Sequence, residues 1–480
     1  MSDFLTAQEF AQATGGTWLE QPTQPITGVA IDTREDLAGK IFLALRGEKA
    51  DGHAYLNAAK NAGAAAVMIE KKDCECPGIA RLLVPNVQSA LTAAAAAWRQ
   101  KLRCHCVAIT GSAGKTTTRR LIATALEVFG STHASPKSFN NHLGVPLTIL
   151  SAPLGTKFLV VEIGMNHPGE IEPLSRLARP EVAMIVNSGS AHLGGLGSRD
   201  AIALEKCAIA RGLDTSGTFV IHGDSPGLVD LALKERRPAG GLLQLFGQGG
   251  RCLWKLFSRE VNGDGSQNIV VQGPAYGGGR KISFTMRLPG LHNALNATGA
   301  FAAIAALGLD PALATNAMGA VEATDGRMVR ERVGMIDIYN DSYNANPEAM
   351  LASIGAFAEV TTTAKRRVLA LGDMHELGEQ SQALHAMVGE KIATAFSGNP
   401  PEIIMTCGPL SAEIARAAKT LQPQVHVEMI GDLTVEAPRL AALLHAGDAL
   451  LIKGSRASSM ERLLEAIRGE NSRAKSAKTS

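Results

Sequence analysis

The stretch AITGSAGKTTT, Ala108–Thr118, decides the fold of this chain. A phosphate-binding loop usually reads G-x-x-x-x-G-K-[ST], with four residues between its two glycines. Here the expected first glycine is replaced by Ile109, and the nearer glycine is Gly111, so the loop is shorter. Glycines lack a Cβ atom, so Gly111 and Gly114 let backbone N–H groups turn inward toward a phosphate. The stretch therefore predicts a phosphate site, in a shortened form.

The segments on either side support this interpretation. The apolar run CVAIT precedes the loop and predicts a strand, and TTTRRLIATALEVFG follows it with apolar residues at helical spacing. A strand before and a helix after are the context that a phosphate loop requires. The helix offers free N–H groups and a positive dipole end, Lys115 adds a cation, and Thr116 offers a hydroxyl to Mg²⁺. The residues predicted to contact the nucleotide here are Gly111, Ser112, Ala113, Gly114, Lys115, Thr116 and Thr117.

Length and composition limit the class of protein. The chain has 480 residues, of which 45% are hydrophobic and 19% charged, as is typical of a globular protein with about three domains. A net charge of +2 gives no reason to expect a nucleic-acid partner. No apolar run is long enough to predict a membrane span, and the N-terminus does not resemble a signal peptide.

The cysteines favour a reducing compartment. There are seven, an odd number, which argues against a disulfide framework and fits the cytosol. Two pairs have C-x-C spacing, Cys74/Cys76 and Cys104/Cys106, which differs from the usual C-x-x-C of a zinc knuckle. Free thiols are therefore the preferred interpretation.

Three blocks follow one another along the chain. Residues 1–100 read as a small α/β unit, which begins with a helix capped by Thr6 and Glu9 and stopped by Gly15. Residues 101–328 alternate strands and helices around the glycine loop, with a more β-like stretch at about 215–290. Residues 329–468 repeat a doubly wound pattern, and residues 469–480 are a polar tail. The sequence predicts an α/β protein of three domains with mostly parallel sheets.

Two polar residues follow strands of the second block. Glu162 ends the strand FLVVE, and His192 comes shortly after the strand MIVN. Both should lie at the carboxyl edge of the sheet beside the glycine loop, where ligands of open α/β sheets bind. A carboxylate in this place holds or orients Mg²⁺ in phosphate-loop enzymes. Lys206, by its chemistry alone, reads as an ordinary helix lysine.

The order of motifs is that of a known family. TGSAGKTT, VEIGMNHPGE, SAHLGG, LPGLHNALNATGA, TDGRM and NDSYNANP together resemble the Mur ligase family over nearly the whole chain. The short phosphate loop is itself the family form. The resemblance implies an ATP-dependent amide ligase with a small α/β domain that binds UDP-sugar, a central ATP-binding domain with a parallel sheet, and a Rossmann-like C-terminal domain that closes over the site.

Within the family, NDSYNANP and GDMHELG are most similar to members that add D-alanyl-D-alanine to UDP-N-acetylmuramoyl-tripeptide through an acyl phosphate. The resemblance thus implies ATP and Mg²⁺ as cofactors, a monomer, and a place in cytoplasmic peptidoglycan precursor synthesis. Whether the third residue of the tripeptide is lysine or diaminopimelate stays open.

The resemblance also implies roles for individual residues. Catalytic roles fall on Lys115, Glu162, His192 and Arg327. Further nucleotide contacts fall on Asn296, Arg327, Asp341 and Tyr343. Metal contacts fall on Thr116, Glu162, His192 and, as a possible carbamate, Lys206. Substrate contacts fall on Asp32, Thr33, Arg34, Asn140, Asn141, Asn344, Lys453, Ser455 and Arg456.

Two alternatives stay open at this point. The first is another amino-acid ligase of the same family or of the folylpolyglutamate synthase type. The D-N-P-R and DGAHNP motifs of those relatives are absent from the chain. The second alternative belongs to another class, a phosphate-loop NTPase that uses hydrolysis as a switch. Such a protein would need no UDP-sugar domain and no carboxylate substrate.

Overall fold

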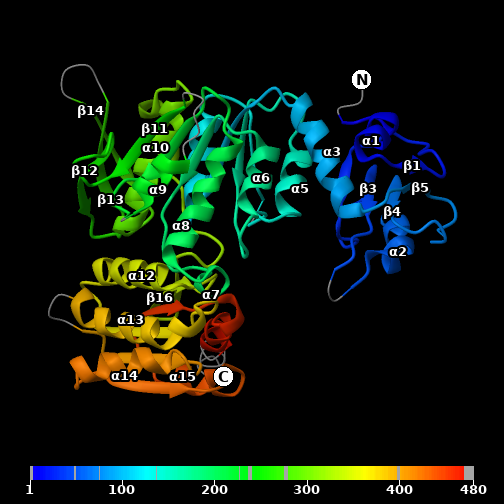
Figure 1. Cartoon of the computed structure of the whole chain (residues 1–480). Helices are drawn as coiled ribbons and strands as arrows, with labels where there is room; N and C mark the ends of the chain where they lie inside the picture. Colours follow the sequence, from blue (N-terminus) through cyan, green and yellow to red (C-terminus); the bar gives the residue numbers. More distant parts are fainter. Residues whose placement is uncertain are drawn as a thin grey trace.

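A computed structural model describes residues 4–47, 50–74, 76–136, 138–225, 227–235, 241–274, 279–396 and 400–469. Three β-sheets follow one another along the chain, with five, nine and six strands, and helices flank them (Figure 1). The predicted α/β architecture in three units is thereby confirmed. Nearly all of the predicted polar tail, residues 470–480, lies outside the described residues.

The N-terminal unit is a five-stranded sheet of order β1-β5-β4-β3-β2, parallel except for β1. Its elements are α1 (Ala7–Thr14), β1 (Thr17–Trp18), β2 (Gly28–Ala30), β3 (Lys40–Leu43), η1 (Gly52–Tyr55), α2 (Leu56–Asn61), β4 (Ala66–Ile69), β5 (Ala80–Leu83) and α3 (Val87–Lys101). The predicted capping box is confirmed, because Thr6 and Glu9 bond each other's backbone N–H groups. The end of α3 reaches the middle unit, where the Trp98 indole N–H donates to the Ala152 carbonyl.

The middle unit carries the phosphate loop in a nine-stranded sheet. Its strands are β6 (His105–Thr110), β7 (Thr132–Ala134), β8 (Phe158–Glu162), β9 (Val182–Ile185), β10 (Thr218–His222), β11 (Leu242–Gly247), β12 (Trp254–Val261), β13 (Gln267–Gly273) and β14 (Arg280–Met286). Its helices are α4 (Lys115–Glu127), α5 (Gly144–Ser151), α6 (Ile171–Ala178), α7 (Leu193–Leu196), α8 (Arg199–Cys207), η2 (Ala208–Gly212), α9 (Leu228–Glu235), α10 (Leu291–Ala306), η3 (Pro311–Ala314) and α11 (Thr315–Gly319).

The strand order in the middle sheet is β14-β13-β12-β11-β10-β9-β6-β8-β7. The strands from β7 to β12 run parallel, whereas β13 and β14 pair antiparallel. Because β6, β8 and β9 are neighbours, their carboxyl ends meet at one edge of the sheet. Ligands of such sheets bind at that edge.

The C-terminal unit is a six-stranded sheet of order β15-β16-β20-β17-β18-β19, in which only β15 is antiparallel. Its elements are β15 (Val329–Val333), β16 (Ile336–Asp341), α12 (Pro347–Val360), β17 (Arg366–Gly372), η4 (Gly378–Gln380), α13 (Ser381–Ala395), β18 (Ile403–Cys407), α14 (Ala412–Leu421), β19 (His426–Ile430), α15 (Leu433–Ala441), β20 (Asp448–Lys453) and η5 (Arg456–Ser458). The predicted doubly wound pattern is present in its parallel strands.

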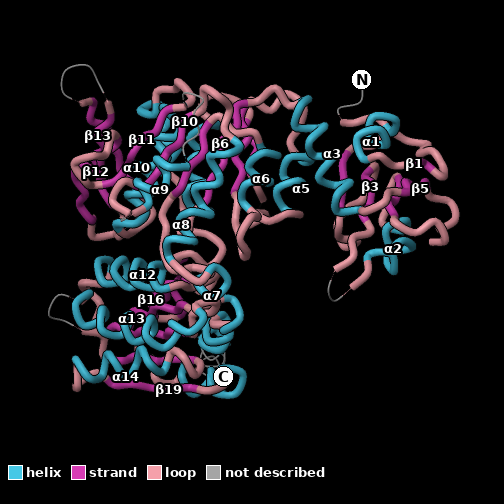
Figure 2. Tube along the Cα trace, viewed as in Figure 1, coloured by secondary structure: helices cyan, strands magenta, loops and turns pink. Residues whose placement is uncertain are grey.

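The units are arranged so that the C-terminal one covers the phosphate loop's side of the middle one. Helix α12 lies at their boundary, and the N-terminal unit stands to the side, joined through α3 (Figures 1 and 2). Within the described ranges, no helix is both long and apolar enough to cross a membrane.

Candidate active site

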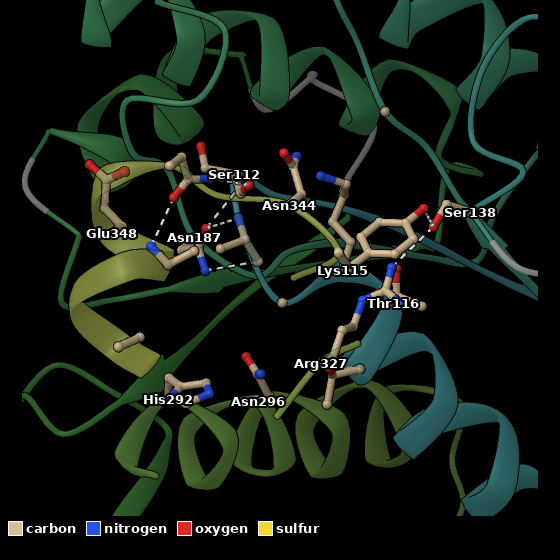
Figure 3. A pocket seen from close by; sticks show the side chains of 18 of the residues that line it. Ser112, Lys115, Thr116, Ser138, Asn187, His292, Asn296, Arg327, Asn344 and Glu348 are labelled. Carbon is tan, nitrogen blue, oxygen red and sulfur yellow. Dashed lines mark hydrogen bonds between the residues drawn. The ribbon is translucent and has the colours of Figure 1, made fainter. Parts of the chain in front are cut away.

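A cavity of about 560 Å³ lies between the phosphate loop and the C-terminal unit (Figure 3). The loop joins β6 to α4, and Gly114 immediately precedes the helix with a φ of 77°, a conformation that favours glycine. A Cβ atom at Gly114 would also lie 3.0 Å from Oδ1 of Asn296 on α10. The glycine therefore serves both the turn and the close approach of α10.

The loop is held in shape by Asn187, which follows strand β9. Its Oδ1 accepts hydrogen bonds from the backbone N–H groups of Ser112, at 3.1 Å, and Ala113, at 2.9 Å. Its side-chain nitrogen donates to the Ala113 carbonyl at 3.0 Å. One side chain thus fixes the loop backbone on two sides before any ligand binds (Figure 3).

Lys115 lies half-buried in the cavity wall, and its ammonium donates to the Gly111 carbonyl at 2.7 Å. Desolvation lowers its pKa, and the nearby Glu162 carboxylate opposes that shift. Among the described residues, the hydrogen bond given for the amine is to the loop that it would share with a phosphate. Release from Gly111 would let it reach an anion without leaving the cavity.

Glu162 ends β8 and is only 1% exposed. One carboxylate oxygen accepts from the Thr116 hydroxyl at 3.0 Å, and the other accepts from Nδ2 of Asn140 at 2.9 Å. Arg119 lies 3.7 Å from the same carboxylate. The structure brings the predicted hydroxyl and carboxylate ligands of Mg²⁺ together.

These donors fit Mg²⁺. The ion prefers oxygen ligands and binds through one or two carboxylates together with substrate phosphates, keeping several waters. Thr116 and Glu162 supply a hydroxyl and a carboxylate beside the phosphate loop. Among the described residues, no group of three or more His, Cys, Asp or Glu side chains forms a cage for a metal. The arrangement suits a metal ion that arrives with phosphate.

Arg327 lies on the segment that joins the middle unit to β15 of the C-terminal unit, and its side chain reaches the phosphate loop. Its guanidinium donates to the hydroxyls of Thr116 and Ser138, each at 3.2 Å. It also stacks 3.7 Å from the ring centre of Tyr343, whose own hydroxyl donates to Ser138 at 2.7 Å. The predicted arginine and tyrosine thus contact each other and share Ser138 as a partner, and Figure 3 shows Arg327 beside Thr116 and Ser138.

Asp341 and Lys453 form a buried ion pair at the carboxyl ends of two neighbouring strands of the C-terminal unit. They end the neighbouring strands β16 and β20, and the Lys453 ammonium lies 2.7 Å from the Asp341 carboxylate. The lysine also donates to the Asn344 carbonyl at 3.0 Å, and Ser353 bonds the same carboxylate. These residues line the cavity. Their mutual pairing gives Lys453 a structural partner in addition to its predicted role toward a substrate.

His192 and Lys206 occupy different surroundings. His192 lines the cavity, and its Nδ1 lies 2.6 Å from a carboxylate oxygen of Glu376 in the C-terminal unit. Lys206 on α8 is 1% exposed, and its burial, followed by the nearby Lys115 charge, lowers its pKa well below the ordinary value. The neutral amine is the form that can react with carbon dioxide. Its carbamylation stays a prediction.

The structure does not bring every predicted residue to the cavity. Asn296, Asn140, Asn141 and Asn344 line it, and Asn141 also caps the start of α5. Ser455 and Arg456 are absent from the cavity wall, and Ser455 bonds the Asp373 carbonyl. The N-terminal candidates Asp32, Thr33 and Arg34 lie in another unit.

The three N-terminal candidates lie on the loop after β2. Arg34 pairs with Asp32 at 2.6 Å, and its hydrogen bond lowers the pKa of Asp32 to about 2. Both side chains are solvent-accessible, which leaves them open to a ligand.

Sequence reasoning missed several residues of the cavity wall, namely Ser138, Asn187, His292, Asn346 and Glu348. Asn187 could have been found, because it ends the apolar run MIVN as Glu162 ends the run FLVVE. Asn346 caps α12 and donates to the Ser112 carbonyl at 3.1 Å, a contact across 234 positions that no local pattern reveals. Burial lowers the pKa of His292 to about 4, so that histidine is neutral near pH 7.

Replacing Asn187 by alanine is expected to weaken nucleotide binding about tenfold. The loop would lose three hydrogen bonds that fix its backbone, each contributing about 1 kcal/mol, partly replaced by water. Calorimetric titration with an ATP analogue measures the change. Asn268→Ala, on β13, is the control, since Asn268 bonds Asn262 and Thr285 outside the cavity. Equal affinities of the two variants would show that the loop holds its shape without Asn187.

The fold and the cavity define a class of protein. A phosphate loop, a carboxylate and hydroxyl beside it, and an arginine at the junction with a second α/β unit are the parts of a nucleotide-dependent phosphoryl-transfer enzyme that works between domains. Models of the Mur ligase family match all three units: the catalytic domain model at residues 25–99, the middle domain at 109–304, and the glutamate ligase domain at 326–456. The chain belongs to the Mur ligase family, as its motifs predicted.

Individual relatives match this chain over nearly its whole length, in sequence and in structure. The chain is 34% identical to the UDP-N-acetylmuramoyl-tripeptide–D-alanyl-D-alanine ligase of Synechocystis sp., covering 93% of each chain. Its structure is similar to that of MurF from Acinetobacter baumannii, with a TM-score of 0.85 and 28% identity over 97% of this chain and 98% of that one. The MurF ligase of Thermotoga maritima in complex with ADP matches with a TM-score of 0.77 and 25% identity, over 93% and 98% of the two chains.

Proposed function

We propose that this protein is an ATP-dependent ligase that joins D-alanyl-D-alanine to UDP-N-acetylmuramoyl-tripeptide. The observation that carries the proposal is the meeting, in one cavity, of Lys115 and the Thr116–Glu162 pair with Arg327, which lies at the junction with the C-terminal unit. The named activity of the Synechocystis relative, which is similar over 93% of both chains, supports the choice of substrates.

The reaction needs an activated carboxylate, since a carboxylate and an amine do not condense in water at a useful rate. An oxygen of the tripeptide's terminal carboxylate attacks the γ-phosphorus of ATP, the bond to the bridging oxygen breaks, and ADP departs. The free amine of D-alanyl-D-alanine then attacks the carbonyl carbon of the acyl phosphate. The tetrahedral intermediate loses inorganic phosphate, the nitrogen loses a proton, and the amide remains.

The side chains of the cavity suit this chemistry because phosphoryl transfer depends on positioning and on neutralising spread negative charge. Lys115 and Arg327 would place two cations around the transferring group. Thr116 and Glu162 would hold Mg²⁺, which when bound neutralises the phosphate charge and orients the oxygens. Asn187 and the loop amides would fix the phosphates. No protein nucleophile is required.

The C-terminal unit covers the cavity, and this cover would protect the reaction intermediate from water. An acyl phosphate is easily hydrolysed, so a closed site that excludes water protects it. Three hydrogen bonds hold this boundary together beside the phosphate loop. They join Arg327 to Thr116, Tyr343 to Ser138, and Asn346 to Ser112. Closure of this boundary would both complete the site and shield the intermediate.

The remaining assignments belong to the same proposal. Asp32, Thr33 and Arg34 would bind the UDP-sugar, Asn140 and Asn141 would face its peptide, and Lys453, Ser455 and Arg456 would meet the dipeptide. Lys206 would bridge a second Mg²⁺ as a carbamate. Asp341 and Asn296 would contact the nucleotide. The protein would act as a monomer in the cytoplasm.

Phosphate release tests the proposal. With ATP, Mg²⁺ and UDP-N-acetylmuramoyl-tripeptide, release should depend on D-alanyl-D-alanine, and the product should have the mass of the pentapeptide precursor. Parallel reactions with lysine- and diaminopimelate-containing tripeptides would identify the third residue. Release without the dipeptide would favour an NTPase switch. Preference for a single amino acid would favour another ligase of the family.

A further inference from the structure

The segment between β9 and α8, which includes the short helix α7, is held by the C-terminal unit on both sides of His192. On one side, Glu376 faces His192 at 2.6 Å and its carbonyl accepts the Gly194 N–H at 2.8 Å. On the other, Oε1 of Glu348 accepts from both the N–H and the hydroxyl of Ser190, each at 2.9 Å. Two glutamates from different elements of one unit thus fix one segment of the other.

The same segment also touches the phosphate loop. The N–H of Gly189 donates to the Ser112 hydroxyl at 2.8 Å, beside the contact from Asn346 to the Ser112 carbonyl. A change in how the C-terminal unit sits would therefore reach both the phosphate loop and His192. The contacts form a continuous path from α12 and the β17–η4 loop to the cavity.

The backbones at this boundary approach closely and adopt demanding conformations. His192 and Glu376 both have a φ of 66°, in the left-handed region that such residues rarely occupy. A Cβ at Gly194 would lie 3.0 Å from the Gly378 nitrogen, and one at Gly189 would lie 2.5 Å from Cδ of Glu348. Strained residues that face each other across a boundary indicate that the surrounding structure holds them for a use.

We propose that Glu376 is a positioning residue that orients the His192 imidazole toward the Mg²⁺ of the nucleotide once the C-terminal unit has closed. The inference rests on the proposed function and on the predicted metal role of His192. A carboxylate at Nδ1 makes that nitrogen the donor and leaves the lone pair on Nε2, the arrangement in which histidine binds metal. The metal site is then complete only when both units are together.

The geometry gives Glu376 no direct part in the chemistry. It is absent from the cavity wall, whereas His192 lines it. Its carboxylate lies 2.6 Å from Nδ1 of His192, on the side of the imidazole ring away from Nε2. The residue acts through the histidine.

Binding of AMP-PNP tests the proposal without ligation. Calorimetry with Mg²⁺ should show Glu376→Ala binding the analogue about tenfold more weakly than the unaltered protein, as expected when the partner of a metal-binding histidine is removed. In EDTA the two should bind equally. Glu376→Gln should recover most of the loss, because its amide oxygen still accepts from Nδ1. With Mn²⁺, the ¹⁴N modulation in pulsed electron spin resonance should weaken in Glu376→Ala.

Two matched variants separate positioning from general effects. Glu379→Gln removes an exposed charge in the same loop, and Glu359→Ala breaks the ion pair with Arg259 across the same boundary. Neither should change the Mg²⁺-dependent part of binding. In a His192→Ala background, Glu376→Ala should add no further loss.

The proposal is overturned if Glu376→Ala and Glu379→Gln bind the Mg²⁺ complex alike. Two other results would also overturn it: a loss that persists without His192, or the absence of ¹⁴N modulation from the unaltered protein. A thermal melt checks that the variants fold, and Glu376→Met, which keeps the side-chain length but offers no oxygen acceptor to Nδ1, replaces Glu376→Ala if the latter does not. None of these readouts involves a peptide substrate, so failure of dipeptide-dependent phosphate release would overturn the proposed function alone.

Discussion

Lys115→Ala is expected to lower the rate of ATP-dependent ligation about a thousandfold or more while UDP-sugar binding stays intact. The ammonium donates to the Gly111 carbonyl of the phosphate loop, where a cation can follow charge as it moves between phosphates. The UDP-sugar binds in a separate unit by our proposal and should not sense the change. Single-turnover phosphate release measures the rate, and calorimetry with the UDP-tripeptide measures the binding.

The control for this variant is Lys234→Ala, which removes an exposed lysine from α9 of the same unit. It should leave ligation unchanged. Survival of ligation in Lys115→Ala would show that the loop assignment is wrong. Loss of UDP-tripeptide binding together with ligation would instead indicate a folding defect.

Glu162→Ala is expected to raise the Mg²⁺ concentration for half-maximal rate by about tenfold to a hundredfold. The carboxylate is buried and bonded to the Thr116 hydroxyl, so it is the anionic ligand that the site offers beside the loop. Removing it also takes a charge partner from Arg119, which lies 3.7 Å away. Glu162→Gln keeps the shape and one of the two acceptor oxygens, and should show the same shift in Mg²⁺ with less effect on folding.

The matched control for Glu162 is Glu181→Gln, because Glu181 precedes β9 at the opposite edge of the same sheet, where it pairs with His105. Steady-state rates across a Mg²⁺ titration compare the variants. An Mg²⁺ dependence unchanged in both Glu162 variants would remove that residue from the metal site.

Much of the fold could be predicted because its signals are local. The apolar run before the glycine loop, the helix spacing after it and the capping box at Thr6 each depend on a few adjacent residues. The short strands β1, β7 and β15 carry no such signal, since their pairing partners come from distant positions. The antiparallel end of the middle sheet was expected only as a β-like stretch.

The residues of the candidate site likewise fall into those that the sequence predicts and those that only the structure shows. Lys115, Thr116 and Glu162 could be predicted because the carboxyl ends of neighbouring parallel strands must meet. Arg327 and Tyr343 came from the family resemblance, and the structure places them beside the loop. Other contacts cross the boundary, such as those of Asn346 with Ser112 and of Glu376 with His192. They depend on how the two units pack, so the spacing of residues along the sequence does not predict them.

The shortened loop is the feature that the structure explains best. With two residues fewer between its glycines, the loop is closed by Asn187, which follows β9, and by Asn346 from the C-terminal unit. The phosphate site is thus built partly from the unit that covers it. This arrangement suits an enzyme that must not activate its substrate while the site is open.

Transfer of ¹⁸O from the substrate to phosphate tests the central claim, that ATP activates a carboxylate. UDP-N-acetylmuramoyl-tripeptide labelled with ¹⁸O in its terminal carboxylate is incubated with ATP, Mg²⁺ and D-alanyl-D-alanine, and the released phosphate is analysed by mass. An acyl phosphate requires one ¹⁸O atom in each phosphate released and none in ADP. Unlabelled phosphate, formed at the same rate as the amide or without it, would contradict the account.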